Sequence, residues 1–343
     1  MRSQARRQAH RRRPQAWRGD ECARHKGAGL CWGNSIRHTC VSEPTAGGHT
    51  PMDLRSSLER ILERPEGPTR VSPGDPLATS VLPFLKWAGG KRWLMPLALE
   101  LQGLCTGTYI EPFLGSGAMF FGLRPARALL SDRNKELVDT YRAVATDWKK
   151  VRQRLADHDK SHSAEYYYKI RSSKPTSPVG KAARFIYLNR TCWNGLYRVN
   201  RQGVFNTPIG TKPRAVLDSD DFEAVAGLLA TAILRDGDFQ DQIDEAGPGD
   251  FVFADPPYTV RHQYNGFIKY NEQLFSWADQ ERLRRALYRA RERGAVVVCT
   301  NADHASVREL YQDDFRIFPL TRYSAIAGTG GARGKYAEIV AIG

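Results

Sequence analysis

The chain has 343 residues, and 41% of them are hydrophobic, which is enough to bury one sizeable core and at most a small second one. It has no run of about eighteen apolar residues, and no apolar stretch follows its N-terminal arginines. These features exclude a membrane span and an ordinary secretory signal. We therefore expect a cytoplasmic protein with no membrane partner.

The formal net charge of +14 gathers in two stretches. Residues 1–51 hold ten basic and three acidic residues, and residues 166–217 hold ten basic residues and no acid. Eight aromatic residues are interleaved with the second group. A basic stretch rich in aromatic rings suits a polyanion whose bases can stack, namely a nucleic acid. The alternative interpretation is a solvated basic face.

Taken in chain order, residues 1–80 are rich in Arg, Gly, Pro and Ser, which predicts a disordered basic extension containing one short amphipathic helix at 52–64. From Phe84 onward, short apolar runs alternate with helical patterns, which predicts a doubly wound α/β sheet. The predicted strands are 108–114, 127–131, 232–235, 250–254 and 295–300, and the predicted helices include 134–156 and 271–293. Two final strands, 315–321 and 335–342, are expected to pair antiparallel at the sheet edge.

Residues 155–218 interrupt this α/β rhythm with a helical, aromatic and basic pattern, so they are predicted to form an inserted subdomain. Residues 81–154 and 219–343 then make up the catalytic domain. Within the insertion, residues 198–211 are predicted to form a β-hairpin with Gly203 at its tip.

A strand that runs into a Gly-x-Gly turn occurs at Tyr109–Gly117. Glycines at the carboxyl end of a first strand let the backbone approach a nucleotide closely. The third glycine of the dinucleotide fingerprint is missing, because Phe120 occupies its place, and this disfavours a nucleotide-dependent oxidoreductase. Asp132 ends the second predicted strand, where a carboxylate can accept hydrogen bonds from ribose hydroxyls. Its alternative role is the N-cap of the following helix.

The second candidate site is Asp255-Pro256-Pro257-Tyr258, directly after an apolar strand. An exocyclic amine on a heteroaromatic base is a poor nucleophile, because its lone pair is delocalised into the ring. A carboxylate and a backbone carbonyl can hold its two N–H groups and aim the lone pair at an electrophile. The two prolines fix a rigid turn that presents Asp255 and the Pro256 carbonyl together. Tyr258 offers a ring on which an extruded base can stack.

From Phe84 to the end, the chain resembles the Dam-type, D12-class adenine-N6 DNA methyltransferases. The motifs that carry the resemblance occur in the family's order: Lys86–Lys91 (KWAGGK), Glu111–Gly117 (EPFLGSG), Asp132, the segments 187–190, 194–198 and 203–206, Gly237–Phe239 (GDF) and Asp255–Tyr258 (DPPY). One departure is Phe267-Ile268-Lys269-Tyr270, which stands where the family has Phe-Thr-x-Tyr. Contacts with DNA are therefore expected to differ there.

The resemblance implies a Rossmann-like, S-adenosylmethionine-dependent methyltransferase sheet with an inserted helical and β-hairpin DNA-recognition subdomain. It implies transfer of a methyl group from S-adenosyl-L-methionine to N6 of a flipped-out adenine in double-stranded DNA, as in restriction-modification enzymes. Asp255, Pro256, Pro257 and Tyr258 would be catalytic. The cofactor-binding residues would be Trp87, Lys91, Glu111, Phe113, Gly115, Gly117, Asp132, Asp238, Phe239 and Asp255.

The basic stretch and the recognition segment supply the residues that we expect to contact DNA: Arg184, Asn189, Arg190, Asn194, Arg198, Asn200, Arg201 and Lys212. We expect no metal, because a positive sulfur already activates the methyl group. We expect a monomer or a weak dimer. Two alternatives remain open. Cytosine also presents an exocyclic amine, so N4-cytosine methylation is the nearest one, and a catalytically inactive DNA-binding relative would need neither the glycines nor Asp255.

Overall fold

The computed structural model describes residues 81–91, 94, 105–200, 202–260, 275–323 and 335–343. The predicted basic extension 1–80, with its helix 52–64, and the segment 267–270 lie outside the described residues. Within the described part, no helix is both long and apolar enough to cross a membrane.

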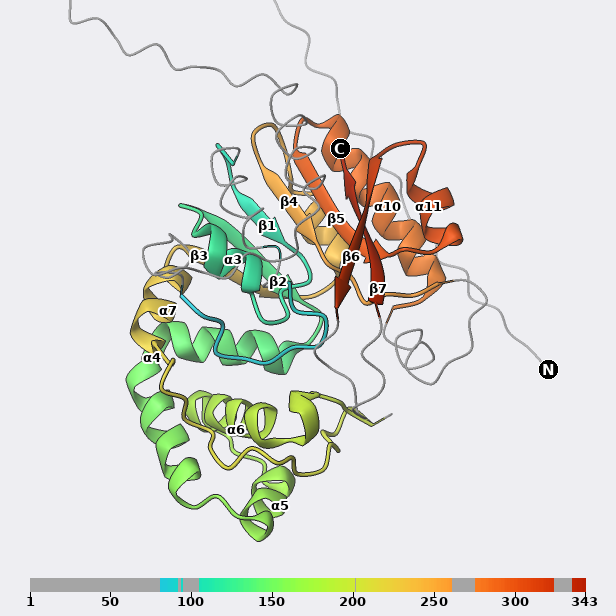
Figure 1. Cartoon of the computed structure of the whole chain (residues 1–343). Helices are drawn as coiled ribbons and strands as arrows, with labels where there is room; N and C mark the ends of the chain where they lie inside the picture. The colour runs from blue at the N-terminus through green and yellow to red at the C-terminus, as the bar shows by residue number, and fades with distance from the viewer. Residues whose placement is uncertain (1–80, 92–93, 95–104, 201, 261–274, 324–334) are drawn as a thin grey trace, which may run out of the picture. The chain divides into compact units, whose positions relative to one another are not determined.

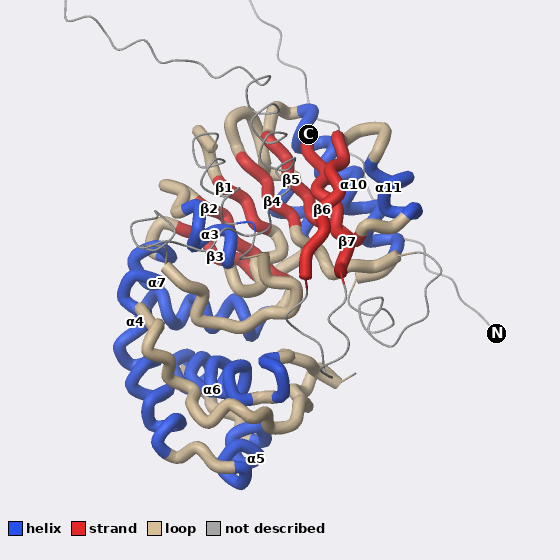
Figure 2. Tube along the Cα trace, in the orientation of Figure 1, coloured by secondary structure: helices blue, strands red, loops and turns tan. Residues whose placement is uncertain are grey.

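A seven-stranded sheet forms the centre of the fold (Figures 1 and 2), with the strand order β3-β2-β1-β4-β5-β7-β6. Its strands are β1 (Tyr109–Glu111), β2 (Ala128–Asp132), β3 (Ala232–Asp236), β4 (Phe251–Ala254), β5 (Val296–Ala302), β6 (Arg316–Tyr323) and β7 (Lys335–Ile342). Strands β1 to β5 are parallel, and β7 pairs antiparallel with both β5 and β6. The predicted doubly wound sheet and its antiparallel terminal pair are confirmed.

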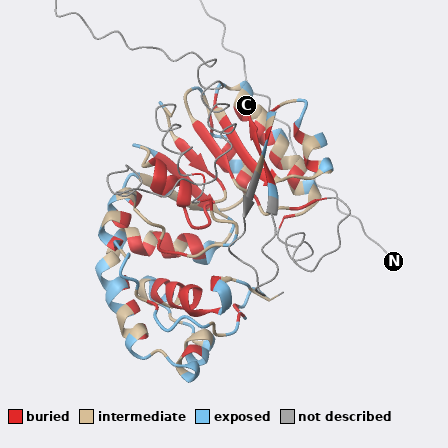
Figure 3. Cartoon of the chain, viewed as in Figure 1, coloured by how far each residue is buried: buried red, intermediate tan, exposed pale blue. Residues whose placement is uncertain are grey.

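Side chains that alternate along each strand divide the core into two layers. Tyr109 of β1 and Phe251 of β4 belong to one hydrophobic cluster, whereas Ile110 and Val252, one position further on, belong to the other. Both faces of the sheet are therefore covered, which is why β1, β2, β4 and β5 are almost wholly buried, whereas the edge strand β3 is partly exposed (Figure 3).

Helices from different parts of the chain cover the two faces. The first layer contains buried residues of α3 (Ala118–Leu123), α4 (Lys135–Lys160), α6 (Pro178–Thr191) and α7 (Phe222–Leu229). The second contains those of α8 (Phe239–Ile243), α10 (Trp277–Glu292) and α11 (Ala305–Tyr311). Local signals explain the ends of these helices. Asn134 caps α4 by accepting from the Leu137 N–H at 3.2 Å, and Ser276 and Asp279 form a capping box at the start of α10.

The insertion between β2 and β3 contains the second part of α4, α5 (Ala164–Ser172), α6 and the 3-10 turn η3 (Trp193–Gly195). Asp147 has non-helical dihedral angles (φ −148°, ψ 57°) and divides α4 into two segments. Leu155 of the second segment shares a hydrophobic cluster with the sheet residue Tyr109. The insertion is thus continuous with the core of the sheet. An antiparallel bridge between Val199 and Phe205 forms the expected hairpin.

Candidate functional site

The candidate site lies where the parallel strands end. Glu111 is the last residue of β1, Asp132 is the last residue of β2, and Asp255 follows β4 directly. Because β1 pairs with both β2 and β4 in parallel, these three carboxylates share the carboxyl edge of the sheet. This edge is where open α/β sheets bind their ligands.

Asp255 is held by two donors, and both bind the same oxygen. The hydroxyl of Thr300, on neighbouring β5, donates to Oδ1 of Asp255 at 2.6 Å. The ammonium of Lys91 lies 2.8 Å from the same oxygen. Thr300 and Lys91 are both buried, whereas the Asp255 carboxylate is 20% exposed. The carboxylate is therefore oriented from the protein side and accessible from the other.

Lys91 connects the opening motif to the tetrapeptide Asp255–Tyr258. Its ammonium donates to the Gly89 carbonyl at 2.7 Å, lies 3.8 Å from a carboxylate oxygen of Glu338, and stands 5.0 Å from the centre of the Tyr258 ring. The Tyr258 hydroxyl in turn donates to Oε2 of Glu338 at 3.0 Å. Burial raises the pKa of Tyr258 well above its ordinary value, so this hydroxyl stays protonated and remains a donor.

The glycine turn after β1 is shaped by its close neighbours. Gly115 and Gly117 have φ of 47° and 66°, in the left-handed region that favours glycine. A Cβ on Gly115 would lie 2.7 Å from Cδ1 of Trp87, so the opening motif packs directly on this turn. The Tyr141 hydroxyl donates to the Gly115 carbonyl at 3.0 Å and fixes the turn from below.

Asp132 is bound to the turn and is not the helix N-cap, a role that Asn134 takes. Its two oxygens accept from the backbone N–H groups of Gly115 and Asn134, at 3.1 Å and 2.8 Å. A carboxylate has about four acceptor positions, so two remain for a ligand. Burial raises the pKa of Asp132.

Glu111 is buried, and its Oε2 accepts from the Tyr109 hydroxyl at 2.8 Å. Burial raises the pKa of Glu111 to about 8, against the opposing effect of this hydrogen bond, and the negative charge of Asp255 raises it further. The carboxyl group of Glu111 is therefore more readily protonated than an ordinary glutamate.

An aromatic cluster stands beside the glycine turn. Phe113 stacks on Phe239 with ring centres 5.4 Å apart, and Phe275 meets Phe113 edge-on at 5.6 Å. Asp238 caps α8 by accepting from the Gln240 N–H and forms an ion pair with Arg282 at 2.7 Å. The structure thus brings the predicted residues Phe113 and Phe239 together in one aromatic cluster, with the Asp238 carboxylate next to it in sequence.

Two residues predicted to contact DNA are instead buried structural residues. Asn189 exchanges two hydrogen bonds with the backbone of Lys86, at 2.9 Å and 2.7 Å. The Arg190 guanidinium forms a bidentate pair with Asp220 and also donates to the carbonyls of Phe84 and Ala215. Neither side chain is more than 1% exposed, so neither is accessible to DNA. They hold the segment Phe84–Lys86 against α6.

Arg184 also turns inward, because it donates to the carbonyls of Ile170 and Arg171 at the end of α5. Asn200 is used within the hairpin, where its Oδ1 accepts from the N–H groups of Gln202 and Val204. The remaining predicted contacts that the structure describes are exposed: Asn194, Arg198 and Lys212. Arg201 lies outside the described residues.

The sequence analysis missed Thr300 and Glu338. Both are polar residues in otherwise apolar strands, and a buried polar group in such a place needs a partner. That signal could have marked them as candidates, although it does not say which partners they have.

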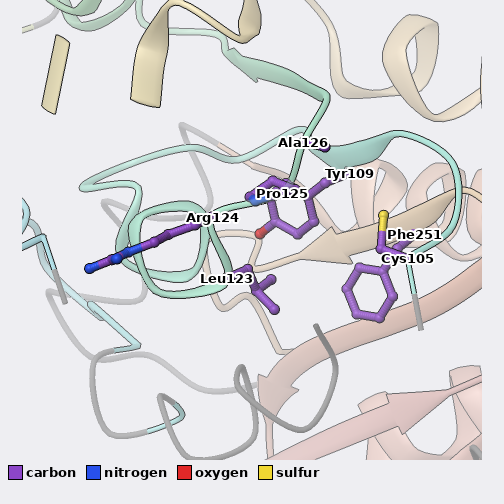
Figure 4. Close-up of a pocket in the computed structure, with 7 residues that line it drawn as sticks. All are labelled: Cys105, Tyr109, Leu123, Arg124, Pro125, Ala126 and Phe251. Carbon is purple, nitrogen blue, oxygen red and sulfur yellow. The ribbon is translucent and has the colours of Figure 1, made fainter. Parts of the chain in front are cut away.

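A hollow of about 260 Å³ lies at the amino ends of the parallel strands, opposite to the candidate site (Figure 4). It is lined by residues that include Tyr109 and Phe251, the first residues of β1 and β4, together with Cys105 before β1. Ligands of open α/β sheets bind at the carboxyl ends of the strands, so this hollow is not the cofactor site. Among the residues that the structure describes, no cluster of three or more His, Cys, Asp or Glu is placed to hold a metal ion.

The fold is a Rossmann-like α/β sheet, and a partly exposed carboxylate, Asp255, follows its strand β4. Comparison with known proteins gives the family. The family model of the D12 class N6 adenine-specific DNA methyltransferases matches residues 87–326. The chain belongs to this family, and the predicted resemblance is confirmed: the protein is an adenine-specific DNA methyltransferase.

Curated relatives agree with the family. The type II methyltransferase M1.LlaDCHI of Lactococcus lactis subsp. cremoris is 36% identical over 267 residues, which cover 75% of this chain and 94% of that protein. The type II methyltransferase M.MjaIII of Methanocaldococcus jannaschii is 34% identical over 244 residues, covering 65% and 84%. The DNA adenine methylase of Escherichia coli (strain K12) is 30% identical over 268 residues, covering 76% and 94%. The oxidoreductase and N4-cytosine alternatives are therefore set aside.

Proposed function

We propose that the methyl donor is S-adenosyl-L-methionine and that the acceptor is an adenine flipped out of double-stranded DNA. The observation that carries this proposal is the Asp255 carboxylate, whose Oδ1 is engaged by Thr300 and Lys91 while the group stays partly exposed. Among the described contacts, no donor reaches its Oδ2. That oxygen is free to accept an N–H group of the target amine.

The residues around the glycine turn fit the proposed cofactor. Asp132 keeps acceptor positions for ribose hydroxyls after binding Gly115 and Asn134. The aromatic cluster of Phe113 and Phe239 is suited to pack against an adenine ring. The neighbouring Asp238 carboxylate is suited to accept from the exocyclic amine of that ring. When bound, S-adenosyl-L-methionine supplies an electrophilic methyl group on a positively charged sulfur.

The chain's own residues then position the target base. Asp255 and the Pro256 carbonyl accept the two N–H groups of the adenine amine, which localises its lone pair. Tyr258, held by its hydroxyl, presents its ring to the flipped base. On methylation the amine would release one proton, and the Asp255 carboxylate that accepts its N–H group would take that proton up.

Exposed basic residues support duplex DNA as the partner. Lys86, Lys212 and Arg214 line a hollow of about 340 Å³. Burial lowers the pKa of Lys86, and the positive charges of Lys212 and Arg190 lower it further. A phosphate at this place would relieve that repulsion.

The test of the catalytic proposal is Asp255→Asn, which keeps the size of the side chain and removes its charge. We expect the methylation rate in a single turnover to fall on the order of a hundredfold or more, with duplex affinity largely retained. The matched control is Asp313→Asn, because Asp313 is an exposed acid that lies outside the candidate site and outside the basic hollow. A rate close to wild type in Asp255→Asn would disprove the proposed role.

A further inference from the structure

Glu338 is a buried carboxylate that the catalytic tetrapeptide alone does not account for. It lies in β7, only 2% of it is exposed, and in the β5–β7 register it stands opposite Ala302. Because β7 runs antiparallel to β5, its beginning lies at the carboxyl edge of the parallel strands, on the strand next to Thr300. The terminal antiparallel strand β7 thus places a second carboxylate beside Asp255 at the candidate site.

Two side chains of the candidate site contact Glu338. The Tyr258 hydroxyl donates to it at 3.0 Å, and the Lys91 ammonium lies 3.8 Å away. Burying a carboxylate inside an apolar strand is costly unless it is paired and hydrogen-bonded. Lys91 of the opening motif and Tyr258 of the tetrapeptide both help to meet that condition, so the place of Glu338 in the strand is tied to them.

Glu338 changes how strongly the Lys91 ammonium neutralises the Asp255 carboxylate. Lys91 lies 2.8 Å from Asp255 and would neutralise it if the two formed an isolated pair. With Glu338 on the other side, one ammonium is shared between two carboxylates and neutralises Asp255 less than it would in an isolated pair. Asp255 therefore remains a strong acceptor for an N–H group.

We propose that Glu338 is a positioning residue for methyl transfer: it fixes the Tyr258 ring through the hydroxyl and draws part of the Lys91 charge away from Asp255. This inference rests on the proposed roles of Asp255 and Tyr258. It adds a requirement that lies about eighty residues further along the chain, in a different strand.

Three variants separate the two contacts in the full-length protein. Glu338→Gln keeps an acceptor for the Tyr258 hydroxyl and removes the charge, Tyr258→Phe removes the hydrogen bond and keeps the ring, and Glu338→Ala removes both. We expect single-turnover rates about tenfold lower for the first two and about a hundredfold lower for Glu338→Ala. The dissociation constants for S-adenosyl-L-methionine and for the duplex should stay within about threefold of wild type, because neither contact binds them directly.

A merely structural role would give a different pattern. Val340→Ala, in the same strand and fully buried, is the matched control, which should lower the melting temperature and leave the single-turnover rate unchanged. Combining Glu338→Ala with Tyr258→Phe should slow the reaction no more than Glu338→Ala alone, because they share one contact. Additive losses would overturn the proposal.

The outcomes also separate this inference from the proposed function. If Asp255→Asn is inactive and Glu338→Gln reacts at the wild-type rate with unchanged ligand affinities, the role of Glu338 is refuted and that of Asp255 stands. If Asp255→Asn keeps its activity, both fail. Should the Glu338 variants be insoluble, a wild-type rate in Tyr258→Phe still overturns the hydrogen-bond part of the proposal.

Discussion

At the scale of single residues, Gly115 shows how the opening motif and the glycine turn depend on each other. Two constraints exclude a side chain there: its φ of 47° disfavours any other residue, and a Cβ would collide with Trp87 at 2.7 Å. Gly203, at the hairpin tip, shares the first constraint, with a φ of 75°, but a Cβ there would meet nothing within 4 Å. Substitutions at Gly115 and Gly203 therefore distinguish the effect of backbone strain alone from that of strain combined with a steric clash.

We therefore expect Gly115→Ala to weaken S-adenosyl-L-methionine binding about tenfold or more, equivalent to about 1.4 kcal/mol, because Trp87 must move. Gly203→Ala should cost about 1 kcal/mol of folding free energy or slightly more, with unchanged cofactor affinity. Titration calorimetry and denaturant unfolding measure the two quantities. Equal cofactor affinities in both variants would show that the Trp87 contact is irrelevant to binding.

Arg190 gives the second prediction at this scale. Replacing Arg190 by Met leaves the Asp220 carboxylate buried without its partner, which should lower the free energy of unfolding by about 3–5 kcal/mol. Lys212→Ala, at an exposed position, should leave stability unchanged and reduce the salt dependence of duplex binding by about one unit of slope. A stable Arg190→Met protein that binds DNA weakly would contradict the structural role and restore the original expectation.

At the scale of elements, α4 and α5 meet through a buried histidine. Nδ1 of His158 lies 2.8 Å from the Tyr166 hydroxyl, and its Nε2 is buried with no hydrogen-bond partner among the described residues. Burial lowers the pKa of His158 to about 4, and the charge of Arg154 lowers it further. The folded insertion therefore holds this ring neutral, whereas the unfolded chain protonates it near pH 6.5.

The sign of the pH effect follows from linkage. Between about pH 6.5 and 4 the unfolded state binds the additional proton, so stability falls as the pH is lowered through this window, by at most about 1.4 kcal/mol per pH unit. His158→Asn keeps a polar atom near Tyr166 without this titration. Unfolding by urea at several pH values should show a shallower loss in the variant. Parallel curves for the two proteins would refute the assignment.

Strands and helices were predicted well from the sequence where a local pattern of apolar residues marks them. Strand β4 is an apolar run and was predicted to within one residue, whereas β1 ends at Glu111, three residues early, because the chain leaves the sheet for the glycine turn. The break of α4 at Asp147 carries no Gly or Pro signal and was not predicted. Arg190 was assigned to DNA because its partner Asp220 lies thirty residues away, outside the acid-free stretch. The role of Glu338 was not predicted for the same reason, because its partners Tyr258 and Lys91 lie far from it in the sequence.

At the scale of the whole molecule, the basic stretch is only partly a DNA-binding surface. Of the nine basic residues of this stretch that the structure describes, six are exposed: Lys169, Lys174, Lys181, Arg198, Lys212 and Arg214. Arg190 is buried, and Arg184 serves the end of α5. The exposed surface of the stretch still carries a net positive charge, so we retain the proposal that it attracts DNA electrostatically.

The hairpin and its basic flanks are expected to have different functions. The hairpin turn is fixed by Asn200, which accepts from the Gln202 and Val204 N–H groups, and the side chains of Gln202 and Asn206 are exposed beside it. A two-stranded ribbon fits the major groove, where each base pair presents a distinct pattern of donors and acceptors. Exposed lysines such as Lys169 and Lys212 suit phosphates, which carry no sequence information.

Replacing Gln202 and Asn206 by Ala should therefore change the relative methylation rates of cognate and near-cognate duplexes, with about 1–3 kcal/mol of discrimination lost for each bidentate contact. Replacing Lys169 and Lys212 by Ala should weaken binding about equally on every duplex and reduce its salt dependence. Single-turnover rates and affinities measured on a panel of duplexes at several salt concentrations distinguish the two effects. A uniform loss with unchanged site preference in the hairpin variants would exclude the hairpin from base recognition and assign it to the phosphate backbone, where most protein–DNA hydrogen bonds are made.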